Sequence, residues 1–295
     1  MASPKNHILV PVDFSEQSLI ALAQSYNLAR LTKSEITLIY VIDDDESSPL
    51  SFFLKSKKQH KKALEKNIKE KLSEVAKDAS QKSSIKIDTM ISYGKIYEEI
   101  NTAAKKLKCS FIVMGTNGTQ GGLRRFIGSN ALRVIREAPC PVITIKGKKH
   151  RFGCQLILLP LDLTTETRQK VNKAIELASY FGSAVKVVSV VTTDDEFIVN
   201  KLNRQLSQVR NYIDEREIIC SAEMIKGDDV AEELMKYAKQ VKADLIMIMT
   251  QEEMNWTKRF IGSAAQEVIN GTEIPVLTVQ PKELPASIVV TPFSY

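Results

Sequence analysis

The sequence has few of the residues that build metal centres or covalent catalytic sites. It contains three histidines and four cysteines among 295 residues. The cysteines form no CxxC pair and no histidine clusters near them, so zinc sites and Cys–His catalysis are disfavoured. We expect four reduced, mostly buried thiols, namely Cys109, Cys140, Cys154 and Cys220.

Long apolar runs are also missing. No uncharged stretch approaches the ~20 residues that cross a bilayer. The N-terminal sequence MASPKNHILVPVDF lacks the apolar core and cleavage pattern of a signal peptide. We therefore expect a cytoplasmic protein with no membrane partner. The composition is 43% hydrophobic and 26% charged, which is typical of a globular protein.

The charge is divided unevenly along the chain. Residues 1–150 carry 25 Lys and Arg against 15 Asp and Glu, whereas residues 151–295 carry 16 against 20. The basic first half favours anionic partners. Its most basic run, residues 55–71, lacks interleaved aromatics and has acidic residues at helical spacing. We interpret that run as a solvated helix face, which makes a nucleic-acid partner improbable.

An internal repeat with a period near 150 residues organises the chain. HILVPVDFS aligns with QLILLPLDLT, so that Asp13 corresponds to Asp162. RRFIGSNALRVI aligns with KRFIGSAAQEVI, so that Gly128 corresponds to Gly262. The first copy therefore holds about fifteen extra residues in its middle, around its basic segment. The predicted domains are residues 1–148 and 153–282, followed by a tail at 283–295.

Short apolar runs alternate with helical patterns in the first copy. After Ser15, which can cap a helix, apolar residues follow at helical spacing. Strands alternating with helices form parallel sheets covered on both faces. Each copy is thus predicted to be an α/β, doubly wound, five-stranded parallel sheet. The strands are expected at residues 8–12, 36–41, 85–91, 111–114 and 141–145, and the later helices at 52–80, 96–107 and 129–136.

The candidate binding residues follow two of these strands. Asp13 follows the first strand, and Gly115 and Gly118 follow the fourth. Ligands on doubly wound sheets bind at the carboxyl ends of strands, where the strand order reverses. Glycines there let backbone approach a sugar or phosphate. Gly128 and Ser129 open the next helix, whose N-terminal N–H groups attract anions.

Two further features of this region bear on its interpretation. The carboxylate of Asp13 can accept hydrogen bonds from a base or ribose, and Arg124 and Arg125 could approach phosphates from the intervening loop. The pattern alone leaves alternatives open. The glycines also suit a plain strand–loop–helix turn, and Asp13 also suits an N-cap carboxylate.

The spacing G-x2-G-x9-G-S, the opening VPVDFS and the closing PCPVITI resemble the universal stress protein family in its tandem form. The resemblance runs from His7 to about Lys282. It implies that the ligand is ATP. Asp13 and the backbone at Val41 would hold adenine, in a pocket shaped by Pro11 and Val12. The ribose and phosphate path would be lined by Met114, Gly115, Asn117 and Gly118, and the phosphates would be bound by Gly128, Ser129 and Asn130. Asn130 stands where family members often have an apolar residue.

The resemblance also implies how the copies associate. In tandem members the two halves pair with each other, which predicts an intramolecular pseudo-dimer and leaves a homodimer open. The second copy departs from the binding pattern, because Met249 replaces Gly115 and Glu252 replaces Gly118. Side chains and negative charge would then occupy the phosphate path. We expect this copy not to bind ATP as the family motif does.

The function expected from the sequence is that of a cytoplasmic ATP-binding stress or signalling protein with an unidentified protein partner. Mg²⁺ would accompany the nucleotide through its phosphates. Hydrolysis would be slow at most, and no enzyme is expected, because the chain has no Walker A lysine and no evident base. The alternative is a nucleotide-independent interaction scaffold of the same fold. An adenylyl-transferring ligase would need a further catalytic signature, which the sequence does not contain.

Overall fold

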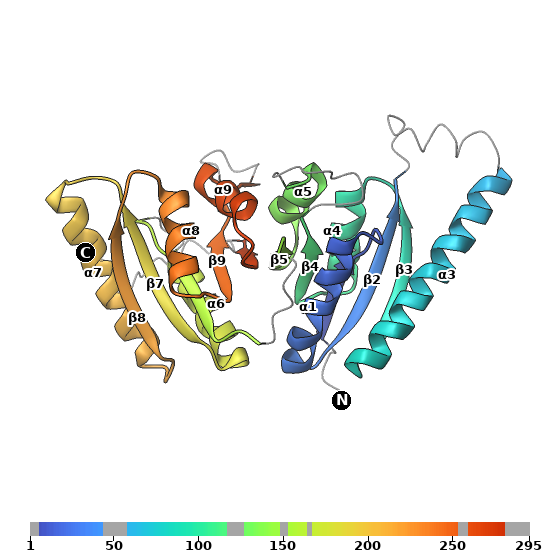
Figure 1. Ribbon diagram of the computed structural model, residues 1–295, viewed down its shortest axis with the longest axis horizontal. Coiled ribbons are helices and arrows are strands. Elements are labelled where there is room, and N and C mark those ends of the chain that lie inside the picture. The colour runs from blue at the N-terminus through green and yellow to red at the C-terminus, as the bar shows by residue number, and fades with distance from the viewer. Residues whose placement is uncertain are drawn as a thin grey trace, which may run out of the picture. The chain divides into compact units, whose positions relative to one another are not determined.

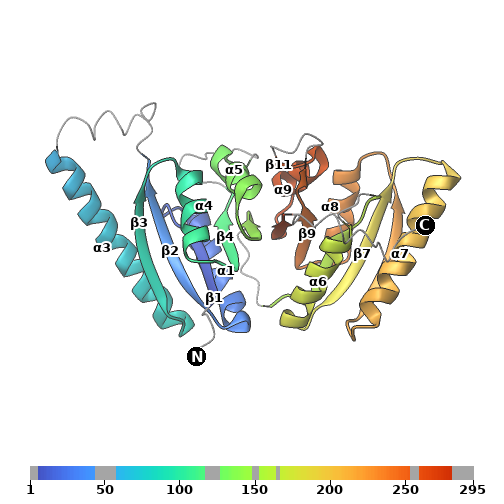
Figure 2. The ribbon, with the colours of Figure 1, turned by 180° about the vertical axis from the view of Figure 1, so that it is seen from behind.

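The computed structural model describes residues 6–43, 58–116, 127–147, 153–163, 167–252 and 259–280. The chain divides into two compact units, residues 1–152 and residues 153–295, called here the first and the second unit. Each unit is a five-stranded parallel sheet with helices packed against it, as Figure 1 and Figure 2 show. The predicted fold, two doubly wound α/β domains, is confirmed.

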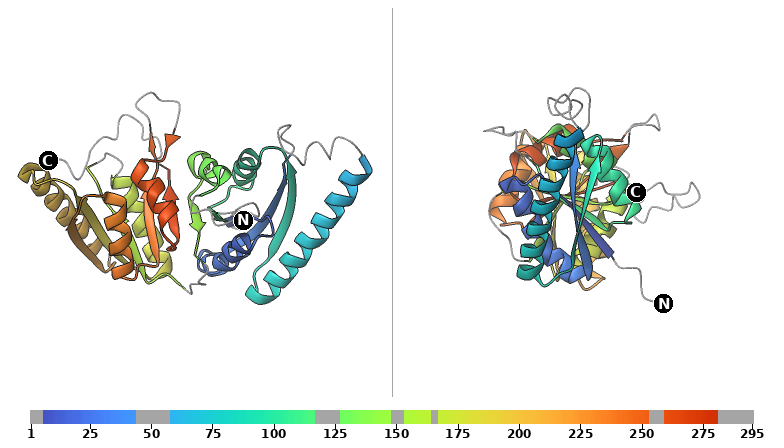
Figure 3. Two further views of the ribbon diagram at one scale, coloured as in Figure 1. Left: turned by 45° about the horizontal axis from the view of Figure 1, so that its top comes forward. Right: turned by 90° about the vertical axis from the view of Figure 1, so that its right-hand side faces the viewer.

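The first unit has the strand order β3-β2-β1-β4-β5. Helices α1 and α3 pack against each other on one face of this sheet, and α4 and α5 pack together on the other (Figure 3). The strands are β1 (Asn6–Pro11), β2 (Ser34–Ile42), β3 (Ile87–Tyr93), β4 (Phe111–Gly115) and β5 (Val142–Ile145). The helices are α1 (Glu16–Thr32), α3 (Lys58–Ser83), α4 (Ile96–Lys106) and α5 (Ser129–Glu137).

The second unit repeats this plan with the strand order β8-β7-β6-β9-β12. Its strands are β6 (Leu156–Pro160), β7 (Ala184–Val191), β8 (Cys220–Lys226), β9 (Leu245–Met249) and β12 (Val276–Val279). Its helices are α6 (Thr167–Phe181), α7 (Glu196–Asp214), α8 (Val230–Gln240) and α9 (Ser263–Gly271). One element has no described counterpart in the first unit: β10 (Gln251–Glu252) and β11 (Arg259–Phe260) form a small antiparallel ribbon after β9.

The central strands of both units are buried on both faces, because helices cover each side of the sheet. The inner side of α1 carries apolar residues at helical spacing, such as Ala21, Leu22 and Leu28, and each is at most 4% exposed. This alternation of apolar strands and apolar helix stripes is the pattern from which the fold was predicted.

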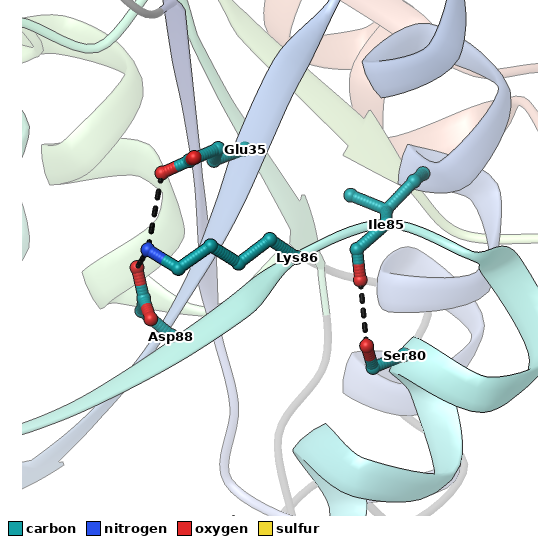
Figure 4. Close-up of polar contacts among 5 residues, drawn as sticks. All are labelled: Glu35, Ser80, Ile85, Lys86 and Asp88. Atoms are coloured by element: carbon teal, nitrogen blue, oxygen red, sulfur yellow. Dashed lines mark hydrogen bonds and ion pairs between the residues drawn. The ribbon is translucent and has the colours of Figure 1, made fainter.

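The connection from α3 to β3 differs from the prediction. Helix α3 continues to Ser83 and β3 begins only at Ile87. The reason is local: Ser80 Oγ donates to the carbonyl oxygen of Ile85 at 2.7 Å, and the Ile85 N–H donates to Ser83 Oγ at 3.2 Å. Figure 4 shows the Ser80 contact and, beside it, Lys86 between Glu35 and Asp88. Residues 52–57 of the predicted helix lie outside the described residues.

Candidate functional site

Asp13 lies immediately beyond β1 and is held by the start of α1. Its Oδ1 accepts from the Ser15 N–H at 3.0 Å and from the Ser15 hydroxyl at 2.5 Å. The Ser15 Oγ in turn accepts from the Ser18 N–H at 3.2 Å, so Ser15 is the N-cap of α1. The predicted cap is thus confirmed. Asp13 is fixed by the cap but is not itself the N-cap residue.

An aromatic pair that the sequence reasoning missed adjoins Asp13. Phe14 has a φ of 63°, in the left-handed region that side chains rarely adopt. Its ring stacks on Tyr40 with centroids 5.1 Å apart, and the Lys71 ammonium lies 4.5 Å from the Phe14 centroid. Burial and then the negative charge of Asp13 raise the pKa of Tyr40, because both disfavour the phenolate.

Strands β1 and β4 stop pairing with each other before they reach their carboxyl ends. The ladder joins Ile8 with Phe111 and Leu9 with Ile112, while β1 runs on to Pro11 beside β2. Proline has no N–H to donate to a ladder, so Pro11 suits the end of this pairing. The strand order reverses here, which makes the carboxyl ends of β1 and β4 the position where doubly wound sheets bind ligands. These two strand ends are called the first switch point below.

Gly115, at the end of β4, has a packing role that the sequence did not predict. A Cβ atom at this position would lie 3.0 Å from the backbone carbon of Gln17 and 3.1 Å from its Cβ. Contacts at these distances are tighter than most that real Cβ atoms make, so a side chain here would push the first turn of α1 away by a few tenths of an ångström. The absence of a side chain at Gly115 is therefore explained by the close approach of α1.

Gly128 is less crowded by its described neighbours. Among these, a Cβ atom at Gly128 would meet only the carbonyl oxygen of Thr116, at 3.6 Å. The Gly128 N–H donates to that same oxygen at 3.0 Å, which ties the start of α5 to the end of β4. Gly128 and Ser129 are both exposed, and among the described residues no side chain caps the α5 N-terminus. Its N–H groups can thus serve an anion.

The described site residues lie at one end of the first sheet. The Val12 N–H donates to Ile39 O at 2.9 Å, which extends β1 beside β2, and Val41 lies near the end of β2. Met114 is buried near the end of β4, and Asn130 is half-buried in the first turn of α5. Asn117, Gly118, Arg124 and Arg125 lie outside the described residues, so their predicted roles stay predictions.

The equivalent positions of the second unit are occupied differently. Met249, which replaces Gly115, is buried at the end of β9. The backbone after it enters the β10–β11 ribbon, which includes Glu252. Asp162 is exposed, and the N-cap residue of α9 is Gly262, as that of α5 is Gly128, so neither N-cap residue supplies a side-chain hydrogen bond. The helix start is thus shared by the two units, whereas the residue at the central strand end is not. Thr164, which aligns with the cap residue Ser15 in the repeat, lies outside the described residues.

Within the described part of the chain, no helix combines the length and apolarity needed to cross a membrane. The same residues contain no group of three His, Cys, Asp or Glu side chains that could hold a metal ion. All four cysteines are reduced, three of them buried and Cys220 half-buried. Burial raises the pKa of the Cys109 thiol to about 12, so it stays protonated.

Two doubly wound α/β units in tandem, with a glycine-bearing strand end in the first, define the class of protein. The family model of the universal stress protein family matches the chain twice, at residues 5–146 and 154–280. The chain therefore belongs to the universal stress protein family.

Individual relatives support this assignment. Universal stress protein MJ0531 of Methanocaldococcus jannaschii is 36% identical over 146 residues, covering 48% of this chain and 82% of the relative. Universal stress protein MJ0577 of the same organism is 29% identical over 153 residues, covering 48% and 94%. A crystal structure of a universal stress protein from Archaeoglobus fulgidus covers 93% of this chain and 96% of its own at a TM-score of 0.73. At 19% identity, that structure supports the fold alone.

Proposed function

We propose that the first unit binds an adenine nucleotide at the first switch point, and that the protein is a cytoplasmic stress-response or signalling protein whose partner interactions depend on that nucleotide. One arrangement carries the proposal: the fixed carboxylate of Asp13 and the uncapped N-terminus of α5 lie at the ends of neighbouring strands. The first is an acceptor for a base or ribose, and the second is a site for phosphates.

The surroundings fit a polyanionic ligand better in the first unit than in the second. The first half of the chain carries the surplus of basic residues, and charge of that sign attracts nucleotides. Mg²⁺ would enter with the nucleotide, held mainly by its phosphates. The described groups of the site, a carboxylate fixed by the helix cap and the N–H groups of a helix start, are groups that bind a nucleotide, and this supports a role in binding.

The test is an equilibrium titration of the full chain with ATP and Mg²⁺, comparing Gly128→Ala with Gly262→Ala. Both glycines precede a helix with a φ that any residue adopts, so neither change strains the backbone. We expect Gly128→Ala to weaken ATP binding by about tenfold, since a methyl group would separate phosphate from the α5 N–H groups. Gly262→Ala should leave the affinity unchanged.

The opposite outcomes identify the alternative function. If purified protein carries no nucleotide and ATP causes no thermal shift, the nucleotide-independent scaffold is the better account. If Gly262→Ala weakens binding and Gly128→Ala does not, the nucleotide belongs to the second unit.

A further inference from the structure

Lys170 is a lysine on the sheet-facing side of a helix. Residues Val171, Ala174 and Leu177 form the apolar inner stripe of α6, and Lys170 continues that stripe toward the helix start. Its side chain is buried, with 7% of the residue exposed. Lysine is rarely buried to this extent, so its position calls for a specific reason.

The Lys170 ammonium donates to the carbonyl oxygen of Pro160 at 3.2 Å. Successive residues of β6 direct their backbone N–H and carbonyl groups alternately toward its two neighbouring strands, β7 and β9. The Leu161 N–H donates to Val188 of β7, whereas the Leu156 carbonyl accepts from Asp244, next to β9. Pro160 lies an even number of residues from Leu156 and thus directs its carbonyl toward β9.

The ladder toward β9 has already ended at Pro160. It pairs Ile157 with Leu245 and Leu158 with Ile246, and no later residue of β6 pairs with β9. The Pro160 carbonyl therefore faces the place where β6 and β9 separate, called here the second switch point. The ammonium of Lys170 thus supplies this carbonyl with the donor that a backbone N–H of β9 would supply if the ladder continued.

The first unit has no such group at the equivalent position. Under the repeat alignment Lys170 corresponds to Ala21 and Pro160 to Pro11. Ala21 is fully buried on the inner stripe of α1, and its methyl group cannot reach the Pro11 carbonyl as a lysine does. The two units thus share the strand separation and differ in whether a side chain of the same unit enters it.

We propose that Lys170 closes the second switch point from within, taking the space that the nucleotide takes in the first unit, so that the chain binds a single nucleotide. This inference rests on the proposed nucleotide site for its functional meaning and on the Lys170–Pro160 contact for its structure. It adds to Met249 a second and independent reason to expect no nucleotide in the second unit.

The deciding experiment is hydrogen–deuterium exchange on the full-length protein, comparing Lys170→Met with Lys173→Met. Methionine keeps the length of the side chain and removes its donor. Lys173 is the matched control, one turn away and paired with Glu176 near the surface. Lys170→Met should speed exchange in peptides covering residues 156–163 and 245–250 about tenfold, and Lys173→Met should not. Unchanged exchange in Lys170→Met would overturn the proposal.

Two ligand titrations separate this inference from the proposed function. Millimolar inorganic phosphate should not stabilise the wild type more than Lys170→Met; a Lys170-dependent stabilisation would overturn the proposal by showing an open anion site. The reciprocal variant Ala21→Lys should weaken ATP binding at least tenfold, and unchanged affinity in a folded Ala21→Lys protein would contradict the shared location. If the wild type itself binds no ATP, the nucleotide proposal fails, while the exchange comparison still decides the role of Lys170.

Discussion

The two units have the same arrangement of strands and helices but different residues at the carboxyl ends of their central strands. Both have the same strand order, the same proline at the end of the first strand and a helix that begins without a side-chain cap after the fourth. They differ at two repeat-equivalent pairs, Gly115 against Met249 and Ala21 against Lys170. In each pair the second unit has the larger side chain, and under the proposal above these side chains fill the second switch point.

The comparison also separates two roles of glycine. Gly115 leaves little space for a side chain beside the backbone of Gln17, whereas no described residue confines Gly128 in a comparable way. A loss of ligand binding after changing Gly115 would therefore be ambiguous, since the helix α1 would also move. Gly128 and Asp13 are the better positions for testing a ligand.

The largest effect is expected at Met249. Met249→Gly removes a buried side chain at the end of β9 and should lower the free energy of unfolding by about 4 kcal/mol. Met249→Leu, which keeps the volume, should lower it by less than about 1.5 kcal/mol. Urea unfolding of both variants gives the comparison. Equal and small losses would mean that Met249 does not fill the strand end.

Gly115→Ala should destabilise the first unit by about 2 kcal/mol, because the added methyl group overlaps the backbone of Gln17. Gly128→Ala is the matched control and should change the unfolding free energy by less than about 0.5 kcal/mol. Chemical denaturation measures both. A neutral Gly115→Ala would remove the packing explanation of this glycine.

Asp13→Asn should weaken ATP binding about tenfold, close to 1.4 kcal/mol, because an amide donor replaces one carboxylate oxygen. Its remaining oxygen can still accept from Ser15, so the helix cap should persist. Asp162→Asn, the corresponding change in the second unit, should have no effect on affinity. Calorimetric titration measures the ATP affinity of both variants. An equal loss of affinity in the two would mean that the two units contribute alike to ATP binding.

Ser15→Ala removes the N-cap of α1 and should cost about 1 kcal/mol of stability. It also removes both hydrogen bonds by which the Ser15 hydroxyl holds Asp13 and the helix start. Ser15→Thr keeps the hydroxyl and should restore the stability. The midpoint of thermal unfolding reports both changes, and a failure of threonine to rescue would argue against capping.

The smallest expected effect is a change in how steeply the free energy of unfolding falls at alkaline pH. Burial, followed by the charge of Asp78, raises the pKa of Tyr26 to about 12. A raised folded pKa favours the protonated form, so its contribution to stability is complete below about pH 10 and is lost between pH 10 and 12. The second unit has Ile175 at this position. Tyr26→Phe should make the unfolding free energy fall less steeply over that range, and an unchanged pH profile would contradict this.

The sequence was sufficient for features that depend on local pattern. Apolar runs located the strands, and the serine two residues beyond Asp13 located the start of α1, which the hydrogen bonds of Ser15 confirm. The placement of Asp13 at the carboxyl end of β1 required nothing more.

Other features depend on contacts between distant segments, and these escaped sequence reasoning. Gly115 meets Gln17 across almost a hundred residues, whereas the pattern of glycines suggested a ligand or a plain strand–loop–helix turn. Lys170 was missed because a lysine in a helix is normally solvated. Its alignment with Ala21, on an apolar stripe, was the available signal.

The central claim is that the first unit binds the nucleotide and the second does not. Native mass spectrometry of the full chain with ATP and Mg²⁺ measures this most directly. The account predicts one nucleotide per chain, weakened in Gly128→Ala and retained in Gly262→Ala. Two nucleotides per chain, or one that is lost only in Gly262→Ala, would contradict it.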